Sequence, residues 1–281
     1  MTGPDVVPEF DPTNCEGSTA PVRSSGEDRR ILVSPVAPVP SPKIGAVQGR
    51  PVVMRQTWSS IVWCHWRVPV EALAGRFGPG VRPDVFDGSA WVGLVPFEMR
   101  DLRVVVAGRA LPSIPTATSF SEVNVRTYVT GPQGPGVWFD TLDASSWLGS
   151  LVARVAWSLP YVRARIASSA ADGPSTRTWS VERTDSTRTR VSVTAGGVII
   201  DKTPLEEFLT ERYALYARAW WAPQRPLWAP VAHAPWVLRS GHDVTVRADL
   251  VRAAGYPVTD VPEHVLCGDG ARVRIGLPRL L

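Results

Sequence analysis

The strongest alternation of apolar and polar positions lies between Phe120 and Val129. It predicts a β-strand, because successive side chains of a strand point to opposite faces. One face is apolar and β-branched and suits packing against another layer; it carries Val123, Val125, Thr127 and Val129. The other face is polar and aromatic, with Phe120, Glu122, Asn124, Arg126 and Tyr128.

The polar face of this strand has two interpretations. It is either a solvated face with an exposed ion pair, or the wall of a cavity. In a cavity, we expect Glu122 and Arg126 to lie near each other, so that each keeps its partner charged. The strand alone leaves both interpretations open.

The same periodicities predict the other elements of the chain. Strands are expected at residues 56–68, 90–100, 102–115, 137–142, 161–166, 177–183, 187–194, 224–238 and 271–275. Pro96 implies an edge strand or a bulge. Helices are expected at residues 69–77, at 148–155 with Asp143 as its cap, at 204–218 and at 249–254. Thr203 and Glu206 have the spacing of a capping box. Many strands with a few inserted helices indicate an α+β fold built on antiparallel sheet.

Composition divides the chain into two parts. Residues 1–50 are rich in Pro, Ser, Gly and charge, which predicts a disordered or loosely ordered tail. Residues 51–281 are expected to form a single domain. The whole chain is 44% hydrophobic, which suffices for a real core.

Charge and cysteine content narrow the range of functions. The formal net charge of +4 comes from scattered arginines interleaved with acids, so nucleic-acid binding is not expected. There is no apolar run long enough for a transmembrane helix and no signal-peptide pattern. The three cysteines form no CxxC pair, which fits a reducing cytoplasm.

Short catalytic motifs give little support to common enzyme classes. There is no P-loop, GxGxxG, HExxH, GxSxG or zinc-finger spacing. The four histidines are widely separated, so neither a metal nor a cofactor is expected. Schiff-base chemistry needs a desolvated lysine. Of the two lysines, Lys43 lies in the tail and Lys202 sits beside Asp201, so both look unsuited.

Several segments, in one order, resemble the YqjF-like bacterial family of unknown function, which is related to the acetoacetate decarboxylase-like superfamily. The segments are IVWCHWRVPVEAL, FDGSAWVGLVPFEMR, FSEVNVRTYV, LDASSWLGSLVARVAWSLPY, TPLEEFLTERYALY and VAHAPW. The resemblance runs from about Val52 to the C-terminus. It implies a closed, mostly antiparallel, barrel-like sheet with an internal cavity and a few helices packed outside. Self-association is expected by analogy.

The superfamily's chemistry carries over only in part. Glu122 matches a glutamate of the resembling decarboxylases. Those enzymes carry Gly-Arg-Glu and then Pro-Lys-Lys, whose first lysine forms the Schiff base. Here Arg154 and Pro160 match, but Tyr161 and Val162 stand where the two lysines would be. The resemblance therefore supports the cavity and argues against amine-catalysed decarboxylation.

Three functions remain. The first is a cofactor-independent enzyme, of lyase, cyclase or isomerase type, acting on a small carbonyl or polyketide-like metabolite. The Lys-poor composition, typical of high-GC bacteria, suggests secondary metabolism. The second is a non-catalytic small-molecule binder using the same cavity, and the third a structural protein. Glu122, Arg126 and Tyr161 are the candidate catalytic residues. The candidate binding residues are Asn124, Tyr128, Arg154, His65, Trp63, His233 and Trp236.

Overall fold

Long β-strands make up most of the chain that the structure describes. The computed structural model describes residues 46–112, 118–146, 158–169, 175–219 and 221–281. The helical elements are η1 (Val70–Leu73), α3 (Pro204–Thr210) and α4 (Asp249–Ala253). The strands are β1 (Ala46–Val47), β2 (Arg50–Val68), β3 (Arg82–Pro83), β4 (Ala90–Val106), β5 (Arg109–Ala110), β6 (Phe120–Gly131), β7 (Gly134–Ala144), β8 (Tyr161–Ser169), β9 (Thr176–Arg183), β10 (Arg188–Val198), β11 (Ala214–Arg218), β12 (Pro226–Ala232), β13 (Leu238–Ala248), β14 (His264–Gly276) and β15 (Arg279–Leu280).

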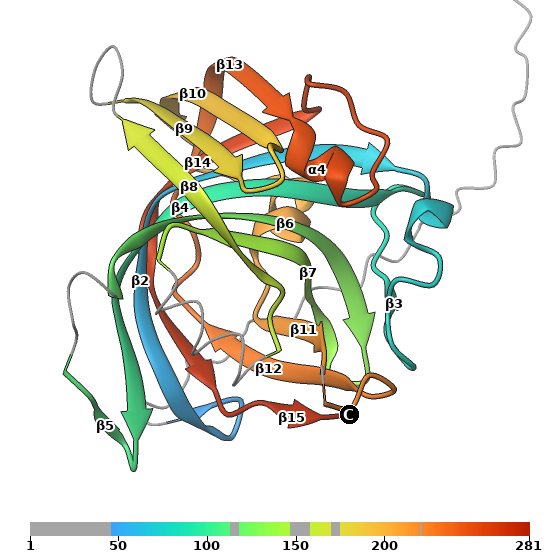
Figure 1. The fold of residues 1–281 in the computed structure, drawn as a ribbon, viewed down its shortest axis with the longest axis vertical. Coiled ribbons are helices and arrows are strands. Elements are labelled where there is room, and N and C mark those ends of the chain that lie inside the picture. The colour runs from blue at the N-terminus through green and yellow to red at the C-terminus, as the bar shows by residue number, and fades with distance from the viewer. Residues whose placement is uncertain (1–45, 113–117, 147–157, 170–174, 220) are drawn as a thin grey trace, which may run out of the picture. The chain divides into compact units, whose positions relative to one another are not determined.

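Strand pairing closes the sheet into a barrel (Figure 1). In the order β2, β4, β6, β7, β11, β12 and β14, each strand is hydrogen-bonded to the next, and β14 pairs with β2. Most pairs are antiparallel, but β7 runs parallel to both β11 and β8. The predicted barrel-like sheet is confirmed, and its pairing is mixed at β7 rather than wholly antiparallel.

A second layer covers one side of this barrel. Strands β8, β9, β10 and β13 follow one another in the sheet and lie together at the top of Figure 1. Their apolar side chains pack against the outer face of β2, β4 and β6. This outer core contains, among others, Val62, Cys64, Val92, Leu94, Val123, Val125, Trp179, Val181, Val191, Val193 and Val246. The shared wall of β2, β4 and β6 is therefore buried on both of its faces.

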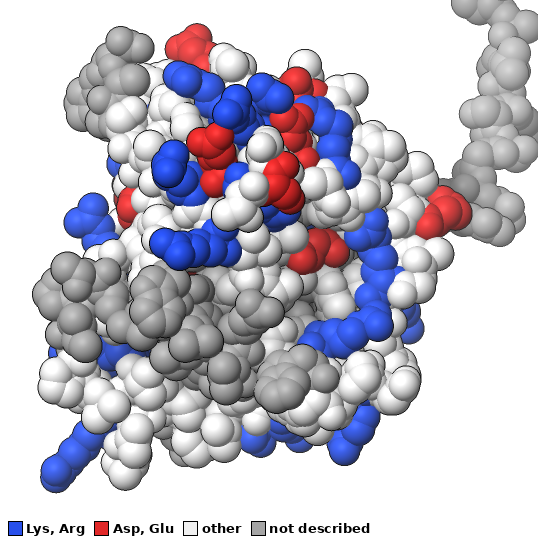
Figure 2. Space-filling view, viewed as in Figure 1, with Lys and Arg blue, Asp and Glu red and all other residues white. Residues whose placement is uncertain are grey.

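The exposed side of the second layer carries charges of both signs (Figure 2). Lys or Arg and Asp or Glu side chains alternate over this region rather than forming a single basic patch. Arg188 lies 2.7 Å from Glu182, and Arg252 lies 2.8 Å from Asp260. These pairs are solvent-exposed, so each contributes little to stability.

Several local predictions are confirmed. The capping box of α3 is present, with the Thr203 side chain accepting from the Glu206 amide and the Glu206 carboxylate accepting from the Thr203 amide. The predicted hairpin around residue 185 is formed by β9 and β10. The short helix α4 is followed by Gly255 with φ +86°, a left-handed conformation that favours glycine.

Two helix predictions and one helix-cap prediction are wrong. The helix expected at residues 204–218 ends at Thr210, because Ala214–Arg218 is strand β11, paired on both sides. The helix expected at residues 69–77 is only the single 3-10 turn η1. Asp143 caps no helix but lies inside β7. In the two helices, a local turn or tertiary strand pairing overrides a weak helical pattern.

Pro96 shows how a proline is accommodated in an internal strand. β4 lies between β2 and β6, so Pro96 is not on an edge. The pairing of β4 with β2 shifts register between Ser59 and Cys64, opposite this proline. The missing amide hydrogen therefore falls where the ladder is already interrupted by a bulge.

Two predicted segments lie mainly or wholly outside the described residues. The helix expected at residues 148–155 lies wholly there, together with Arg154. So do residues 1–45 of the predicted tail, whereas residues 46–50 form β1 and the first residue of β2. The described residues belong to a compact unit that spans Ser41–Leu281.

Candidate functional site

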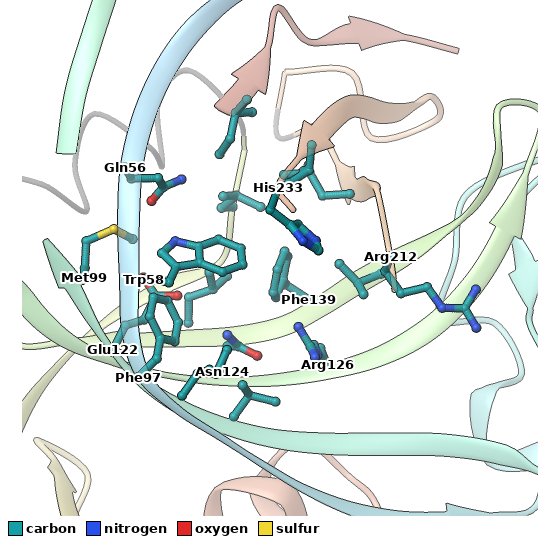
Figure 3. A pocket seen from close by; sticks show the side chains of 18 of the residues that line it. Gln56, Trp58, Phe97, Met99, Glu122, Asn124, Arg126, Phe139, Arg212 and His233 are labelled. Atoms are coloured by element: carbon teal, nitrogen blue, oxygen red, sulfur yellow. The ribbon is translucent and has the colours of Figure 1, made fainter. Parts of the chain in front are cut away.

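A cavity lies inside the barrel, against the inner faces of β2, β4, β6 and β7 (Figure 3). Its volume is about 70 Å³ when counted as the space open to the centre of a water molecule. The walls are mostly apolar and aromatic, and a few polar side chains converge on them. This composition is typical of a small-molecule site.

Strand β6 supplies the polar side of the cavity through its alternation. Glu122, Asn124 and Arg126 point inward and line the cavity, whereas Val123 and Val125 point outward into the outer core. All three polar residues are buried. Of the two interpretations of this strand, the cavity wall is the correct one.

A bulge in β2 brings two tryptophans into the same cavity. Trp58 and Trp63 are an odd number of residues apart, so a regular strand would place them on opposite faces. Ser60, with φ +56°, lies in the register shift between β2 and β4. The bulge reverses the alternation, and both indole rings line the cavity.

Glu122 supplies the carboxyl group of the cavity wall, and its pKa is strongly shifted. It is buried, and its Oε2 accepts a hydrogen bond of 2.9 Å from the Tyr161 hydroxyl. Burial raises the pKa of Glu122 to about 7, while hydrogen bonds from Tyr161 and Asn124 lower it. Burial and the neighbouring Glu122 carboxylate raise the pKa of Tyr161 well above its usual value. Glu122 can therefore take up and release a proton near neutral pH, while Tyr161 stays a hydroxyl donor.

Arg126 carries a buried charge without a carboxylate partner. Among the described residues, no Asp or Glu oxygen lies within 4.0 Å of its guanidinium, and its Nε has no hydrogen-bond partner. The expected pairing with Glu122 is wrong. Residues four apart on a strand are separated by roughly 13 Å along the strand, and Asn124 lies between the two side chains (Figure 3). A buried unpaired cation is costly, so this end of the cavity favours an anion.

Tyr128 and His65 do not line the cavity, although both were candidate binding residues. The Tyr128 hydroxyl donates to the carbonyl oxygen of Leu209 at 2.8 Å and lies 2.6 Å from Nε2 of His65. Because the Tyr128 hydroxyl donates its only proton to the Leu209 carbonyl oxygen, Nε2 of His65 carries the proton of the second hydrogen bond and donates it to the Tyr128 oxygen. Burial lowers the pKa of His65 well below its usual value, so its ring is neutral. These two residues therefore form a buried hydrogen-bond network with α3, close to Arg126.

Sequence reasoning missed Arg212. It lines the cavity, and its guanidinium donates to Asp84 at 2.6 Å and to the Phe208 carbonyl oxygen at 2.6 Å. Figure 3 shows the guanidinium turned away from the cavity centre. Arg212 was expected on a helix, and only knowledge that α3 ends at Thr210 could have placed it at the cavity.

Of the remaining candidate residues, some line the cavity and others do not. Trp63, His233 and Trp236 line the cavity with Glu122, Asn124, Arg126 and Tyr161. Nδ1 of His233 donates to the Ala234 carbonyl oxygen at 2.8 Å, and burial lowers the pKa of the ring. Arg154 lies outside the described residues. Lys202 pairs with Glu211 and is not part of the cavity wall.

The described residues offer no ready metal site and no membrane span. Within them, no group of three His, Cys, Asp or Glu side chains is placed to hold a metal ion. No helix in the described part of the chain is long and apolar enough to cross a membrane. Cys64 and Cys267 are buried and free.

The chain has the acetoacetate decarboxylase-like fold. Acetoacetate decarboxylase from Legionella pneumophila has a TM-score of 0.60 at 8% identity, with 87% of this chain and 93% of that chain covered. The enduracididine biosynthesis enzyme MppR, with HEPES buffer bound, has a TM-score of 0.55 at 15% identity, with 81% and 87% covered. At these identities the likeness shows the fold alone.

Sequence comparison then places the chain in a family. Residues 55–272 match DUF2071, described as an uncharacterized conserved protein, and the chain belongs to this family. It is also 34% identical to the uncharacterized protein YqjF of Bacillus subtilis (strain 168) over 192 residues, which cover 67% of this chain and 76% of the relative. The resemblance drawn from the sequence motifs is thereby confirmed.

Proposed function

We propose that this protein is an enzyme that acts on a small carbonyl compound by general acid–base chemistry, without a metal or nucleotide cofactor. One observation carries the proposal. A single cavity holds a buried carboxyl group with a pKa of about 7, a hydroxyl that donates to it, and a guanidinium without a carboxylate partner. Perturbed groups gathered in one cavity are typical of active sites.

Glu122 is the proposed base. In its ionised form it takes a proton from the carbon next to the substrate's carbonyl group. The C–H electron pair moves toward the carbonyl oxygen, which gives an enolate and a neutral Glu122. Because the pKa of Glu122 is about 7, both of its forms are populated near neutral pH. General acid–base catalysis of this kind contributes about 10²- to 10⁴-fold in rate.

Arg126 and Tyr161 are the proposed partners of this step. Arg126 holds an anionic oxygen of the substrate, either a carboxylate or the forming enolate. Tyr161 keeps its proton and donates a hydrogen bond to Glu122 or to the substrate. The enolate then leads to cyclisation, dehydration or an aldol-type step. Decarboxylation without a Schiff base is a further route.

Two further points support a carbonyl substrate and a reaction route without Schiff-base catalysis by an amine. MppR has been solved in complex with pyruvate and with the condensation product of pyruvate and imidazole 4-carboxaldehyde, and it shares this fold. Tyr161 stands where the resembling decarboxylases carry the imine-forming lysine. The cavity wall described here contains no lysine, so imine formation has no nucleophile there.

The proposal is tested by incubating the purified protein with extract of its source cells and following small molecules by mass spectrometry. Glu122→Gln is the test variant. Glu182→Gln, whose carboxylate pairs with exposed Arg188, is the matched control. We expect the wild type and the control to convert one species into another, and Glu122→Gln to lose this conversion. The mass change names the reaction: loss of water, loss of carbon dioxide, or none for a cyclisation.

If all three proteins retain the same molecule unchanged, the cavity serves a non-catalytic binder and the catalytic role of Glu122 is wrong. If Glu122→Gln converts the substrate as fast as the wild type, another group is the base. A place in bacterial secondary metabolism is supported if the consumed species is a specialised metabolite. Self-association stays a prediction.

A further inference from the structure

Asn124 is a buried polar residue of the cavity wall with no role in the proposed reaction. It lies on the inner face of β6, between Glu122 and Arg126 (Figure 3), and lines the cavity. The residue is 3% exposed, and its Oδ1 is buried without a hydrogen-bond partner among the described residues. Buried acceptors are rarely left unpaired, because such a group has lost its water and gained nothing in return. This point of the cavity therefore favours a ligand group that donates to Oδ1.

The neighbouring Glu122 decides which atom of the Asn124 amide is the free acceptor. An ionised carboxylate only accepts hydrogen bonds, so the amide atom that serves it is the donor Nδ2. Consistent with this, the hydrogen bond from Asn124 lowers the pKa of Glu122, as a donor to the ionised form does. Oδ1 is then the atom left for a ligand.

Arg126, on the other side of Asn124, narrows the chemistry of the donating group. A guanidinium only donates, and an amide oxygen only accepts. A carboxylate suits Arg126 but has no proton for Oδ1 of Asn124. An ammonium group could donate to Oδ1, but the unpaired positive charge of Arg126 opposes a second cation beside it. A hydroxyl group donates and accepts, so it satisfies Oδ1 and tolerates Arg126 as its neighbour.

We infer that Asn124 determines specificity, and that the substrate is a small hydroxylated anion whose hydroxyl group donates to Oδ1 of Asn124. This inference rests on the proposed function and adds to it the hydroxyl group and the residue that recognises it. The size of the cavity agrees with a short hydroxy acid. Its volume of about 70 Å³ is roughly half that of an engineered cavity, of about 150 Å³, that binds benzene in another protein. Recognition therefore depends on polar contacts more than on a large apolar body.

The test compares two small anions, glycolate and propionate. Glycolate carries a hydroxyl group where propionate carries a methyl group, and both have the same number of non-hydrogen atoms, so size does not separate them. Affinity is measured by quenching of tryptophan fluorescence, since Trp58, Trp63 and Trp236 line the cavity. We expect the wild type to bind glycolate about tenfold more tightly than propionate, the effect of one hydrogen bond. Equal affinities, tighter binding of propionate or no binding of glycolate overturns the inference without any variant.

Asn124→Leu removes Oδ1 while keeping a side chain of similar length. Its affinity for glycolate should fall about tenfold, and its affinity for propionate should persist, which also shows that the cavity is still formed. Gln133→Leu removes an amide at an exposed position of the turn between β6 and β7, and as the matched control it should leave both affinities unchanged. A preference for glycolate that survives in Asn124→Leu overturns the assignment of the hydroxyl group to Asn124. If Asn124→Leu does not fold, the two affinities of the wild type decide.

A role of Asn124 in orienting Glu122 alone predicts a different result. Loss of the Nδ2 donor in Asn124→Leu then raises the pKa of Glu122, which is followed by the infrared band of its protonated carboxyl group. The ratio of the glycolate and propionate affinities, however, stays as in the wild type. An unchanged ratio therefore overturns the inference even if the pKa rises.

This outcome is distinguishable from failure of the proposed function. If a Glu122-dependent conversion is found but glycolate is not preferred to propionate, the substrate class is wrong and the enzyme stands. If glycolate is preferred through Asn124 but no Glu122-dependent conversion occurs, the ligand class stands and the protein is a binder.

Discussion

The hydroxyl of Tyr161, at the start of β8, donates a hydrogen bond of 2.9 Å to Oε2 of Glu122 on β6. Burial raises the pKa of Glu122 to about 7, and this hydrogen bond holds it below the value that burial alone would give. In the sheet, β7 lies between β6 and β8 and pairs with both. The parallel pairing of β8 with β7 thus brings the two side chains together.

Tyr161→Phe should raise the pKa of Glu122 above about 7. The phenyl ring keeps the packing but removes the donor that stabilises the carboxylate. A hydrogen bond worth about 1 kcal/mol corresponds to a rise of roughly 0.7 pH units. The change is measured as the pH midpoint of the infrared band of the protonated carboxyl group, assigned by its loss in Glu122→Gln. A midpoint that stays the same or falls contradicts the role given to Tyr161.

Asp143→Asn should destabilise the fold strongly. The Asp143 carboxylate accepts two hydrogen bonds from Arg183, at 2.6 and 2.7 Å, and is fully buried. Removing it leaves the Arg183 charge unpaired, which costs about 3–5 kcal/mol of unfolding free energy.

The measurement for Asp143→Asn is urea denaturation, with Glu182→Gln as the control. Glu182 pairs with Arg188 at the surface, so its loss should cost far less unfolding free energy than the loss of Asp143. Equal losses of unfolding free energy in the two variants would contradict the prediction that burial makes the Asp143–Arg183 pair the more stabilising one. The Asp143 charge also raises the pKa of Glu122, so the infrared midpoint should fall in Asp143→Asn.

Tyr128→Phe should cost about 2 kcal/mol or more of unfolding free energy. It leaves both the Leu209 carbonyl oxygen and the His65 Nε2–H without a partner in a buried setting. An unsatisfied buried group costs about 1–3 kcal/mol. Tyr216→Phe is the control, since its hydroxyl serves one half-buried acceptor, the Gly134 carbonyl oxygen. A smaller loss for Tyr128→Phe than for Tyr216→Phe argues against the supporting role of Tyr128.

Local patterns predicted much of the fold because the forces behind them are local. The alternation at Phe120–Val129 identified β6 and the side chains of its inner face. The spacing of Thr203 and Glu206 identified the start of α3, because the capping box depends only on residues three apart. Closure of the sheet and the internal cavity followed from the resemblance rather than from any spacing in the chain.

The errors at the site arise where distant parts of the chain decide the outcome. His65 lies on β2 and Tyr128 on β6, and both look like inner-face residues. However, the last turn of α3 reaches their end of the barrel, where the Leu209 carbonyl oxygen accepts from Tyr128. No pattern in β2 or β6 could indicate this. The expected ion pair of Glu122 and Arg126 failed for a simpler reason, since i and i+4 are neighbours on a helix but not on a strand.

Glu122→Gln should make the protein more stable at pH 8 while removing the proposed activity. The pKa of Glu122 is raised in the folded state from 4.5 to about 7, so the folded state binds this proton more tightly than the unfolded state. The contribution of this group is therefore greatest below about pH 4.5. It is lost as pH rises to about 7, and the loss amounts to roughly 3 kcal/mol. Glutamine has no charge to desolvate and keeps an acceptor for Tyr161, so the variant avoids this loss.

The measurement is the free energy of unfolding in urea at pH 5 and pH 8 for wild type and Glu122→Gln. The advantage of the variant should be small at pH 5 and larger at pH 8. Burial also raises the pKa of Asp140, to about 6, so the contribution of Asp140 to stability is likewise lost as pH rises, but over a lower pH range. Asp140→Asn therefore serves as a control, because it should leave the pH dependence that comes from Glu122 intact. An advantage of Glu122→Gln that is equal at both pH values would mean that Glu122 does not titrate near neutral pH, which would remove its suitability as the base.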